Sequence, residues 1–473
     1  MQAVDRLLAS PSYGEHWASM WLDLARYADS KGHGSDPLRE IWRYRDWVID
    51  AFNANKPFDE FTIEQLAGDL LEKPTNDQVI ATGFNRNHRI NTEGGAIDEE
   101  WRTEYVIDRV ETMGTVWLGL SLGCARCHEH KYDPLSQKEF YRLFAFFNNL
   151  EEKGFINNLR GSAEPRIPYK ANPKIQVMVM REMKNRRKTR VLGGGQYDAP
   201  GEEVESGLPA FLPPLPAGEK MTRLGLARWL VNGKHPLTAR VLVNRIWEQL
   251  FGTGIVRSVE NLGVQADWPS HPALLDWLAV EFIESGWNLK GLVRKFVLSS
   301  AYRQAHGVDE KRLRLDPANR LLSRGPRLRL QAEMVRDQAL ALSGLLVEKL
   351  GGPSVKTYQP AGLWKALMHP GSNTKNYVAD KGTKLYRRSL YVYWKRTSPH
   401  PMMILFDAPD RESSCVRRSR TNTSLQSLGL LNETQRIEMS RILAERLVTE
   451  AKDDDSRLDL LFTLVASRTP NDA

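Results

Sequence analysis

The chain is poor in cysteine and has no long apolar segment. Three cysteines among 473 residues exclude a scaffold held together by disulfides. No apolar run reaches membrane-spanning length, and the opening segment MQAVDRLLAS lacks the charged and apolar parts of an export signal. There is neither a P-loop nor a G-x-S-x-G elbow, so nucleotide-binding and serine-hydrolase functions have no motif to support them.

The composition is that of a water-soluble globular protein. Charged residues make up 26% and hydrophobic residues 41%, and 66 basic against 58 acidic residues give a formal charge of +8. The two signs are interspersed, and the densest basic run, REMKNRRKTR (181–190), has no aromatic residues to stack on bases. We therefore expect no nucleic-acid partner.

The length predicts two or more domains. Residues 1–152 carry helical apolar patterns, for example at Trp17, Trp21 and Leu24. Residues 153–219 are rich in Pro and Gly, which favours an extended linker with one or two strands. Residues 220–473 are helical again. The predicted fold class is mainly α, with two helical domains joined by a Pro/Gly-rich linker that contains a few short strands.

Several elements of the second half are predicted in more detail. Ser270 should cap a helix that begins at Pro272, and a long helix starting near 331 should end at the glycines 351–352. The run RRSLYVYWKR (387–396) alternates like a strand. Four tryptophans fall on apolar helix stripes and are predicted to be core residues, namely Trp17, Trp21, Trp117 and Trp277.

The segment CARCHEHKYDP (124–134) carries the most specific chemical signal. Cys124, Cys127 and His128 form C-x-x-C-H, the attachment pattern of c-type haem. Two residues between the cysteines match the separation of the porphyrin vinyl groups, and the adjacent imidazole can ligate the iron. The motif lies between a helix predicted over 98–120 and a helix that starts with the capping box Ser-x-x-Glu at Ser136.

Two other interpretations of the cysteine pair remain open. Cys124, Cys127, His128 and His130 are acceptable zinc ligands, although structural zinc usually recruits a distant second pair and the chain offers none. A reduced cysteine pair packed in a helical core is the other alternative.

The identity of a sixth haem ligand would decide the redox chemistry. His130 lies too near the motif in sequence to reach the opposite haem face easily. His88 sits in a polar loop, GFNRNHRINTEGG, and Met113 lies on an apolar helix stripe, so both are weak distal-ligand candidates.

Carboxylates line one face of the helix before the motif. Glu100, Glu104, Asp108 and Glu111 are spaced so that they share this face. In a cleft, Glu104 and Asp108 would be weak catalytic candidates for acid–base chemistry on glycans. With arginines nearby, the same stripe would be an ordinary solvated face.

A charged segment in the second half poses a similar choice. Asp407, Arg411, Arg417 and Arg420 lie around the turn in FDAPDRESSCVRRSR and could hold an anionic or sugar ligand. The alternative is an ion-pair network that fixes the final helices.

Longer stretches resemble known families. RLLASPSYGEHWASMWLDLARYADS and EYVIDRVETMGTVWLGLSLGCARCHEHKYDPLSQKEFYRLFAFFNN resemble the planctomycete cytochrome-c-like domain, whose hallmark is this cysteine motif. HPLTARVLVNRIWEQLFGTGIVRS and FDAPDRESSCVRRSRTNTSLQSLGLLN resemble the planctomycete-specific domain of unknown function that usually follows it. The resemblance covers most of the chain outside the linker.

The resemblance implies an exported protein in which Cys124, Cys127 and His128 attach haem c. It also implies a periplasmic or extracellular location and an N-terminally truncated chain. Electron transfer with a redox partner protein, in the service of polysaccharide degradation, is the function we expect. The alternatives are a non-redox zinc-binding or carbohydrate-binding protein, and a glycan-active hydrolase. Whether the protein is an enzyme is left open.

Overall fold

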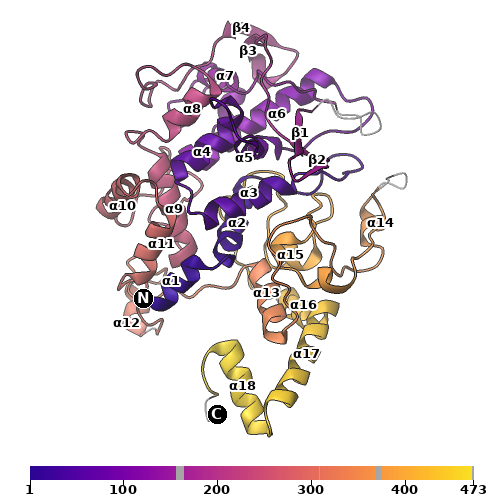
Figure 1. The fold of residues 1–473 in the computed structure, drawn as a ribbon. Helices are drawn as coiled ribbons and strands as arrows, with labels where there is room; N and C mark the ends of the chain where they lie inside the picture. The colour runs from indigo at the N-terminus through magenta and orange to yellow at the C-terminus, as the bar shows by residue number, and fades with distance from the viewer. Residues whose placement is uncertain (156–163, 308, 369–371, 373, 471–473) are drawn as a thin grey trace. The chain divides into compact units, whose positions relative to one another are not determined.

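The computed structural model describes residues 1–155, 164–307, 309–368, 372 and 374–470 and is mainly helical, with four short strands in this part (Figure 1). This confirms the predicted fold class. No helix in the described ranges is long and apolar enough to cross a membrane. Part of the predicted linker, residues 156–163, lies outside the described residues.

The chain forms two compact units. The first contains Met1–Leu328 together with Arg411–Arg417, and the second contains Arg329–Asp410 and Arg418–Ala473. This division falls at a different place from the predicted linker. The helices of the first unit are α1 Gln2–Ala9, α2 Ser12–Leu24, α3 Trp42–Asn53, α4 Phe58–Ala67, α5 Asn76–Ala81, α6 Asp98–Met113, α7 Gln137–Phe144, α8 Arg223–Leu230, α9 Thr238–Phe251, α10 Pro272–Glu284, α11 Leu289–Leu298 and α12 Glu310–Leu315.

Tryptophans form the centre of the first unit, as their helical spacing predicts. Trp21 of α2 is 1% exposed and lies 4.9 Å from Phe61 and 6.0 Å from Trp117, measured between ring centroids. The indole N–H of Trp21 donates to Gln65 Oε1 at 2.7 Å, so its burial leaves no unpaired donor. Burial of these large rings supplies much of the apolar driving force that packs α2 against α4.

Helix α6 leads to the cysteine motif. The predicted helix over 98–120 is observed as α6 followed by a π-helical turn, Gly114–Leu118. Gly119 ends this turn with φ +60°, and a Cβ there would lie 2.9 Å from Val241 Cγ2. The turn therefore needs glycine both for its left-handed conformation and for the close approach of α9.

The segment predicted to be a linker is folded against α7. It contains two antiparallel hairpins, one of β1 Arg166–Tyr169 with β2 Asn172–Met178, the other of β3 Thr189–Leu192 with β4 Pro200–Val204. Strand β3 packs on α7, and Val177 and Met178 are buried. The expected strands are present, but the described part of this segment is packed structure rather than an extended linker.

The second unit is also helical. Its helices are α13 Ala332–Ser343, α14 Leu363–Leu367, α15 Pro401–Leu405, α16 Ser424–Asn432, α17 Thr434–Glu450 and α18 Asp454–Ala466. The long helix predicted to reach the glycines at 351–352 is wrong, because Gly344 ends α13 with φ +77°. The strand-like run at 387–396 forms a 3-10 turn, Ser389–Tyr391, and isolated bridges instead of a strand.

Two details of α10 also correct the sequence analysis. The residue before the helix is His271, and no side chain caps it; the hydroxyl of Ser270 pairs with His271 Nδ1 at 2.9 Å instead. Trp277 is 52% exposed, with Lys295 Nζ 4.8 Å from its ring, so it is not a core residue. The buried face of the helix is formed by Leu275, Leu278 and Phe282.

Candidate functional site

The C-x-x-C-H segment lies on the surface of the first unit. Cys124 belongs to a single 3-10 turn, Gly123–Arg126, and Cys127 follows it directly. Both thiols are free, and Cys124, Cys127 and His128 are all exposed. This excludes the alternative in which the pair packs in a helical core. The chain therefore presents two thiols and one imidazole to solvent.

The ring of His128 is oriented by the backbone. Its Nδ1 lies 2.7 Å from the carbonyl oxygen of Glu129, which favours the tautomer with a proton on Nδ1. No protein partner of Nε2 is found among the described residues, so this nitrogen keeps its lone pair for another ligand. Histidines that bind metal ions commonly donate one ring N–H to a carbonyl and ligate through the other nitrogen.

Helix α7 contacts the turn that carries the cysteines. The backbone oxygen of Arg126 accepts hydrogen bonds from Gln137 Nε2 and from the Tyr141 hydroxyl, each at 3.0 Å. The predicted capping box is confirmed, because the Ser136 hydroxyl accepts from the Glu139 amide and the Glu139 carboxylate accepts from the Ser136 amide. The start of α7 is thus fixed next to the turn that carries the cysteines.

A glycine turn between β3 and β4 packs against the motif. Gly195 has φ +74°, and a Cβ there would lie 2.8 Å from Cys127 Sγ. The Arg126 guanidinium donates to the Gly195 carbonyl at 3.1 Å. A side chain at this position would displace Cys127 or Arg126. The sequence did not indicate this constraint, because the three glycines at 193–195 were assigned to an extended linker.

The carboxylate stripe of α6 is partly buried and paired rather than solvated. Glu104 forms a bidentate ion pair with Arg126, and Asp108 pairs with Arg26 at 2.5 Å. The two arginines of α6 itself, Arg102 and Arg109, pair instead with Glu99 and Glu152. The Glu104 pair links α6 to the turn that carries the cysteines, and the catalytic role of Glu104 and Asp108 remains a prediction.

Glu111, one turn further along α6, lies beside the start of the motif. A Cβ on Gly123 would lie 2.8 Å from Glu111 Oε1. Burial, reinforced by the negative charges of Asp108 and Glu104, raises the pKa of Glu111 to about 7, against a smaller lowering by Arg126. This carboxyl group titrates near neutral pH, which the sequence pattern alone did not indicate.

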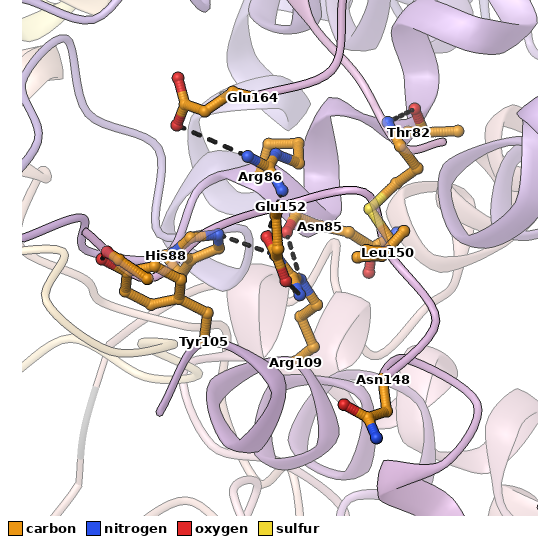
Figure 2. A network of polar contacts seen from close by, with 12 residues as sticks. Thr82, Asn85, Arg86, His88, Tyr105, Arg109, Asn148, Leu150, Glu152 and Glu164 are labelled. Carbon is orange, nitrogen blue, oxygen red and sulfur yellow. Dashed lines mark hydrogen bonds and ion pairs between the residues drawn. The ribbon is translucent and has the colours of Figure 1, made fainter. Parts of the chain in front are cut away.

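The opposite side of α6 faces a buried ion-pair network, defined here as Arg86, His88, Arg109, Glu152 and Glu164 (Figure 2). Both Glu152 oxygens accept from Arg109, at 2.5 and 2.7 Å. Arg86 donates to Glu152 at 2.5 Å and to Glu164 at 3.5 Å. Coulombic and hydrogen-bonding contacts with the two arginines outweigh burial and lower the pKa of Glu152 to about 2.

Both ring nitrogens of His88 have partners within the protein. Its Nε2 lies 2.9 Å from Arg109 Nη2, its Nδ1 lies 2.7 Å from the Arg89 carbonyl, and its ring stacks on Tyr105 at 4.4 Å (Figure 2). Burial, followed by the nearby arginine charges, lowers its pKa well below the ordinary value. Met113 is 0% exposed. Either side chain would have to leave its present contacts to ligate a haem, and their role as distal ligands remains a prediction.

His130 belongs to the loop after the motif. Its ring nitrogen Nδ1 accepts from the Asp133 amide at 2.8 Å, and its backbone amide donates to the Leu135 carbonyl at 2.9 Å. Within the described ranges, no three His, Cys, Asp or Glu side chains are grouped as metal ligands. The zinc alternative, with Cys124, Cys127, His128 and His130 as ligands, remains a prediction.

The charged segment of the second half is divided between the two units. Arg411 pairs with Asp23 at 3.1 Å within the first unit, and Arg417 pairs there with Glu260 at 3.2 Å. In the second unit, Asp407 accepts from the Thr421 amide at 2.9 Å and pairs with Arg329, while Arg420 is exposed. These contacts are those of an ion-pair network, and a ligand at Asp407, Arg411, Arg417 and Arg420 remains a prediction.

Comparison with known protein families gives two matches. Residues 222–473 match the family described as PSD1, protein of unknown function (DUF1553), and residues 1–152 match the family described as PSCyt2, protein of unknown function (DUF1549). No curated protein and no solved structure matches the chain. The site must therefore be interpreted from its own residues.

Proposed function

The chain belongs to the PSD1 family of unknown function, and from the geometry of its C-x-x-C-H segment we propose that it carries one covalent haem c and transfers electrons outside the cytoplasm. The observation that carries the proposal is the joint exposure of two free thiols and of an imidazole whose Nε2 has no partner in the part of the chain that the structure describes. The cysteine spacing is that of haem attachment.

The residues of the segment fit a haem in three respects. Cys124 and Cys127 are accessible for thioether bonds to the vinyl groups, and His128 presents its Nε2 as a possible iron ligand. The set of donors, two thiols and one imidazole, is the one that haem c uses. A tetrahedral zinc ion would need a fourth ligand, for which His130, whose Nδ1 already accepts from the Asp133 amide, is the candidate nearest in sequence.

The surrounding residues would support this group without taking part in bond changes. The Glu129 carbonyl would fix the His128 tautomer, and Gly195 together with the Arg126 to Glu104 pair would hold the turn that carries the cysteines. When bound, haem supplies one-electron chemistry. An exposed attachment site favours electron exchange with a partner protein at the surface, because short separation from the donor or acceptor is needed.

The location follows from the proposal, since haem c is attached outside the cytoplasm. A link to polysaccharide degradation rests on the family resemblance alone, and we include it only as the context in which to search for a redox partner. The sixth ligand is left to experiment, because His88 and Met113 are both buried in their present positions.

The test is haem attachment in cells. The full chain should be exported to a periplasm that contains a cytochrome c maturation system, and haem should be measured as a pyridine haemochrome and by stain on a denaturing gel. We expect one haem per chain, lost in Cys124→Ala and Cys127→Ala. Cys415→Ala is the matched control, because it removes the third free cysteine, which lies outside the motif.

A folded, exported chain without haem would contradict the proposal. Zinc retained by that chain, and lost in Cys127→Ser, would support the non-redox alternative instead. A ferrous spectrum that changes on addition of carbon monoxide would indicate an open sixth position, whereas a spectrum unaffected by carbon monoxide would indicate a protein ligand.

A further inference from the structure

A loop from the second half of the chain contacts the motif region at two points. Within the first unit, the Leu262 amide donates to the Gly119 carbonyl at 2.7 Å, just before the motif. The Val264 amide donates to Asp133 Oδ1 at 2.7 Å, just after it. The loop, residues 258–268, belongs to the region that matches PSD1, whereas the motif belongs to the region that matches PSCyt2.

The approach of this loop to Asp133 is very close. A Cβ on Gly263 would lie 2.4 Å from Asp133 Oδ1, so no other residue fits there without a shift of the backbone or the carboxylate. Asn261 Oδ1 accepts from the Gly263 amide at 2.8 Å, and the Ser258 hydroxyl donates to the Asn261 carbonyl at 2.8 Å. These internal hydrogen bonds fix the loop in the shape that reaches Asp133.

Asp133 connects this loop to the segment that carries His128. It is 7% exposed, its amide donates to His130 Nδ1, and its carbonyl accepts from the Leu135 amide at 2.8 Å. The loop 128–135 is closed by the hydrogen bond from the His130 amide to the Leu135 carbonyl. The buried Asp133 carboxylate, which lies in the loop 128–135, therefore accepts a hydrogen bond from a backbone amide of the region that matches PSD1.

We propose that Asp133 is a positioning residue for His128, and that the loop 258–268 is an integral part of the haem-attachment site rather than of a separate domain. The inference rests on the proposed function for its haem readout. Loss of the carboxylate would leave the Val264 amide without its acceptor and would remove this tie between the loop 258–268 and the loop 128–135, which begins at His128, so the backbone that carries the imidazole would be held less firmly.

The test compares three variants in the exported full chain. Asp133→Ala should reduce haem per chain at least twofold and should broaden or shift the ferrous spectrum of the haem that remains. Asp133→Asn keeps an acceptor oxygen for the Val264 amide and should restore both readouts. Asp267→Ala, an exposed aspartate of the same loop, is the matched control and should behave as wild type. A normal haem content and spectrum in Asp133→Ala would overturn the proposal.

A second measurement separates this inference from the proposed function. Hydrogen exchange in the haem-free full chain should show at least tenfold faster exchange of 128–135 in Asp133→Ala, and wild-type rates in Asp133→Asn. Unchanged exchange in Asp133→Ala would overturn the positioning role even if the wild-type chain carries haem. Conversely, a wild-type chain without haem would reject the proposed function, while faster exchange would still support the structural link between Asp133 and the loop.

Discussion

The C-x-x-C-H segment and the buried ion-pair network lie on different sides of α6 and use their polar groups in opposite ways. In the network, Glu152, Arg86 and Arg109 are each at most 4% exposed, and the Glu152 carboxylate accepts from both arginines (Figure 2). At the motif, the thiols and His128 Nε2 face solvent. Groups that are fully used within the protein stabilise it, whereas oriented but unused groups are available for chemistry.

The two sides of α6 also differ in the charges that surround their carboxyl groups. The network gathers two arginines around Glu152 and lowers its pKa to about 2, whereas the motif side of α6 gathers carboxylates and raises the pKa of Glu111 to about 7. The two sides of α6 thus face different environments: Glu152, in the loop after α7, is held ionised, and Glu111, on the helix itself, titrates near neutral pH. The two groups should respond to mutation and to pH with opposite signs.

The largest effect is expected from Glu152→Ala. Removal of this carboxylate leaves Arg109 and Arg86 buried without their shared partner, and an uncompensated buried charge costs about 3–5 kcal/mol. We expect the free energy of unfolding of the full chain, measured by guanidinium denaturation with tryptophan fluorescence, to fall by that amount. The pH dependence has the same origin. Because the folded pKa of Glu152 is depressed, its contribution is complete above about 4.5 and is lost as the pH falls towards about 2.

Glu151→Ala is the control for this change. Glu151 is adjacent in sequence, but its pair with Arg181 spans 3.7 Å and both side chains are more than half exposed. Such a pair contributes less than about 1 kcal/mol. Equal losses in Glu151→Ala and Glu152→Ala would show that the network is not the stabilising element that its burial indicates.

A smaller loss of stability is expected from a substitution of Arg411, in the segment Arg411–Arg417 that belongs to the first unit. Arg411 is 5% exposed, pairs with Asp23 at 3.1 Å and donates to the Tyr27 carbonyl at 3.3 Å. Arg411→Ala should cost about 2–3 kcal/mol in the same denaturation measurement, because it removes a buried cationic partner of Asp23.

Arg417→Ala supplies the comparison within the same segment. Its pair with Glu260 is 44% and 49% exposed, so we expect a loss below about 1 kcal/mol. If Arg411→Ala were as mild as Arg417→Ala, the segment 411–417 would not be anchored by this pair. That result would favour the alternative in which Arg411 binds a ligand.

The sequence predicted well the features that depend on local periodicity and capping. The stripe of Trp17 and Trp21 gave α2, and Ser136 with Glu139 gave the start of α7. The motif itself was found because its spacing is local. These features involve residues within one or two helical turns, where the physics can be judged from neighbours in the chain.

The sequence could not predict pairings between distant segments. No local pattern marks Glu152, yet it pairs with Arg86 and Arg109, which are 66 and 43 residues away in sequence. Gly195 lay in a glycine-rich run, and only the fold places it against Cys127. Trp277 was misassigned because an apolar spacing does not tell whether another element covers that face.

The smallest effect on stability is expected at Glu111, and its pH dependence has the opposite sign to that of Glu152. Its folded pKa is raised to about 7 from an ordinary 4.5, so the folded state binds more protons between these values. Stability from this group is complete below about 4.5 and is lost as the pH rises through about 7.

Glu111→Gln removes the charge and should stabilise the chain by about 1 kcal/mol at pH 8, where the wild-type carboxylate is ionised beside Asp108 and Glu104. At pH 5, where both proteins are neutral at this position, the difference should be close to zero. Thermal unfolding at the two pH values measures this, and Glu100→Gln, on the same stripe but further from the motif, serves as control. A stabilisation that is equal at both pH values would mean that packing, rather than the charge at the edge of the motif, distinguishes Glu111 from its neighbours.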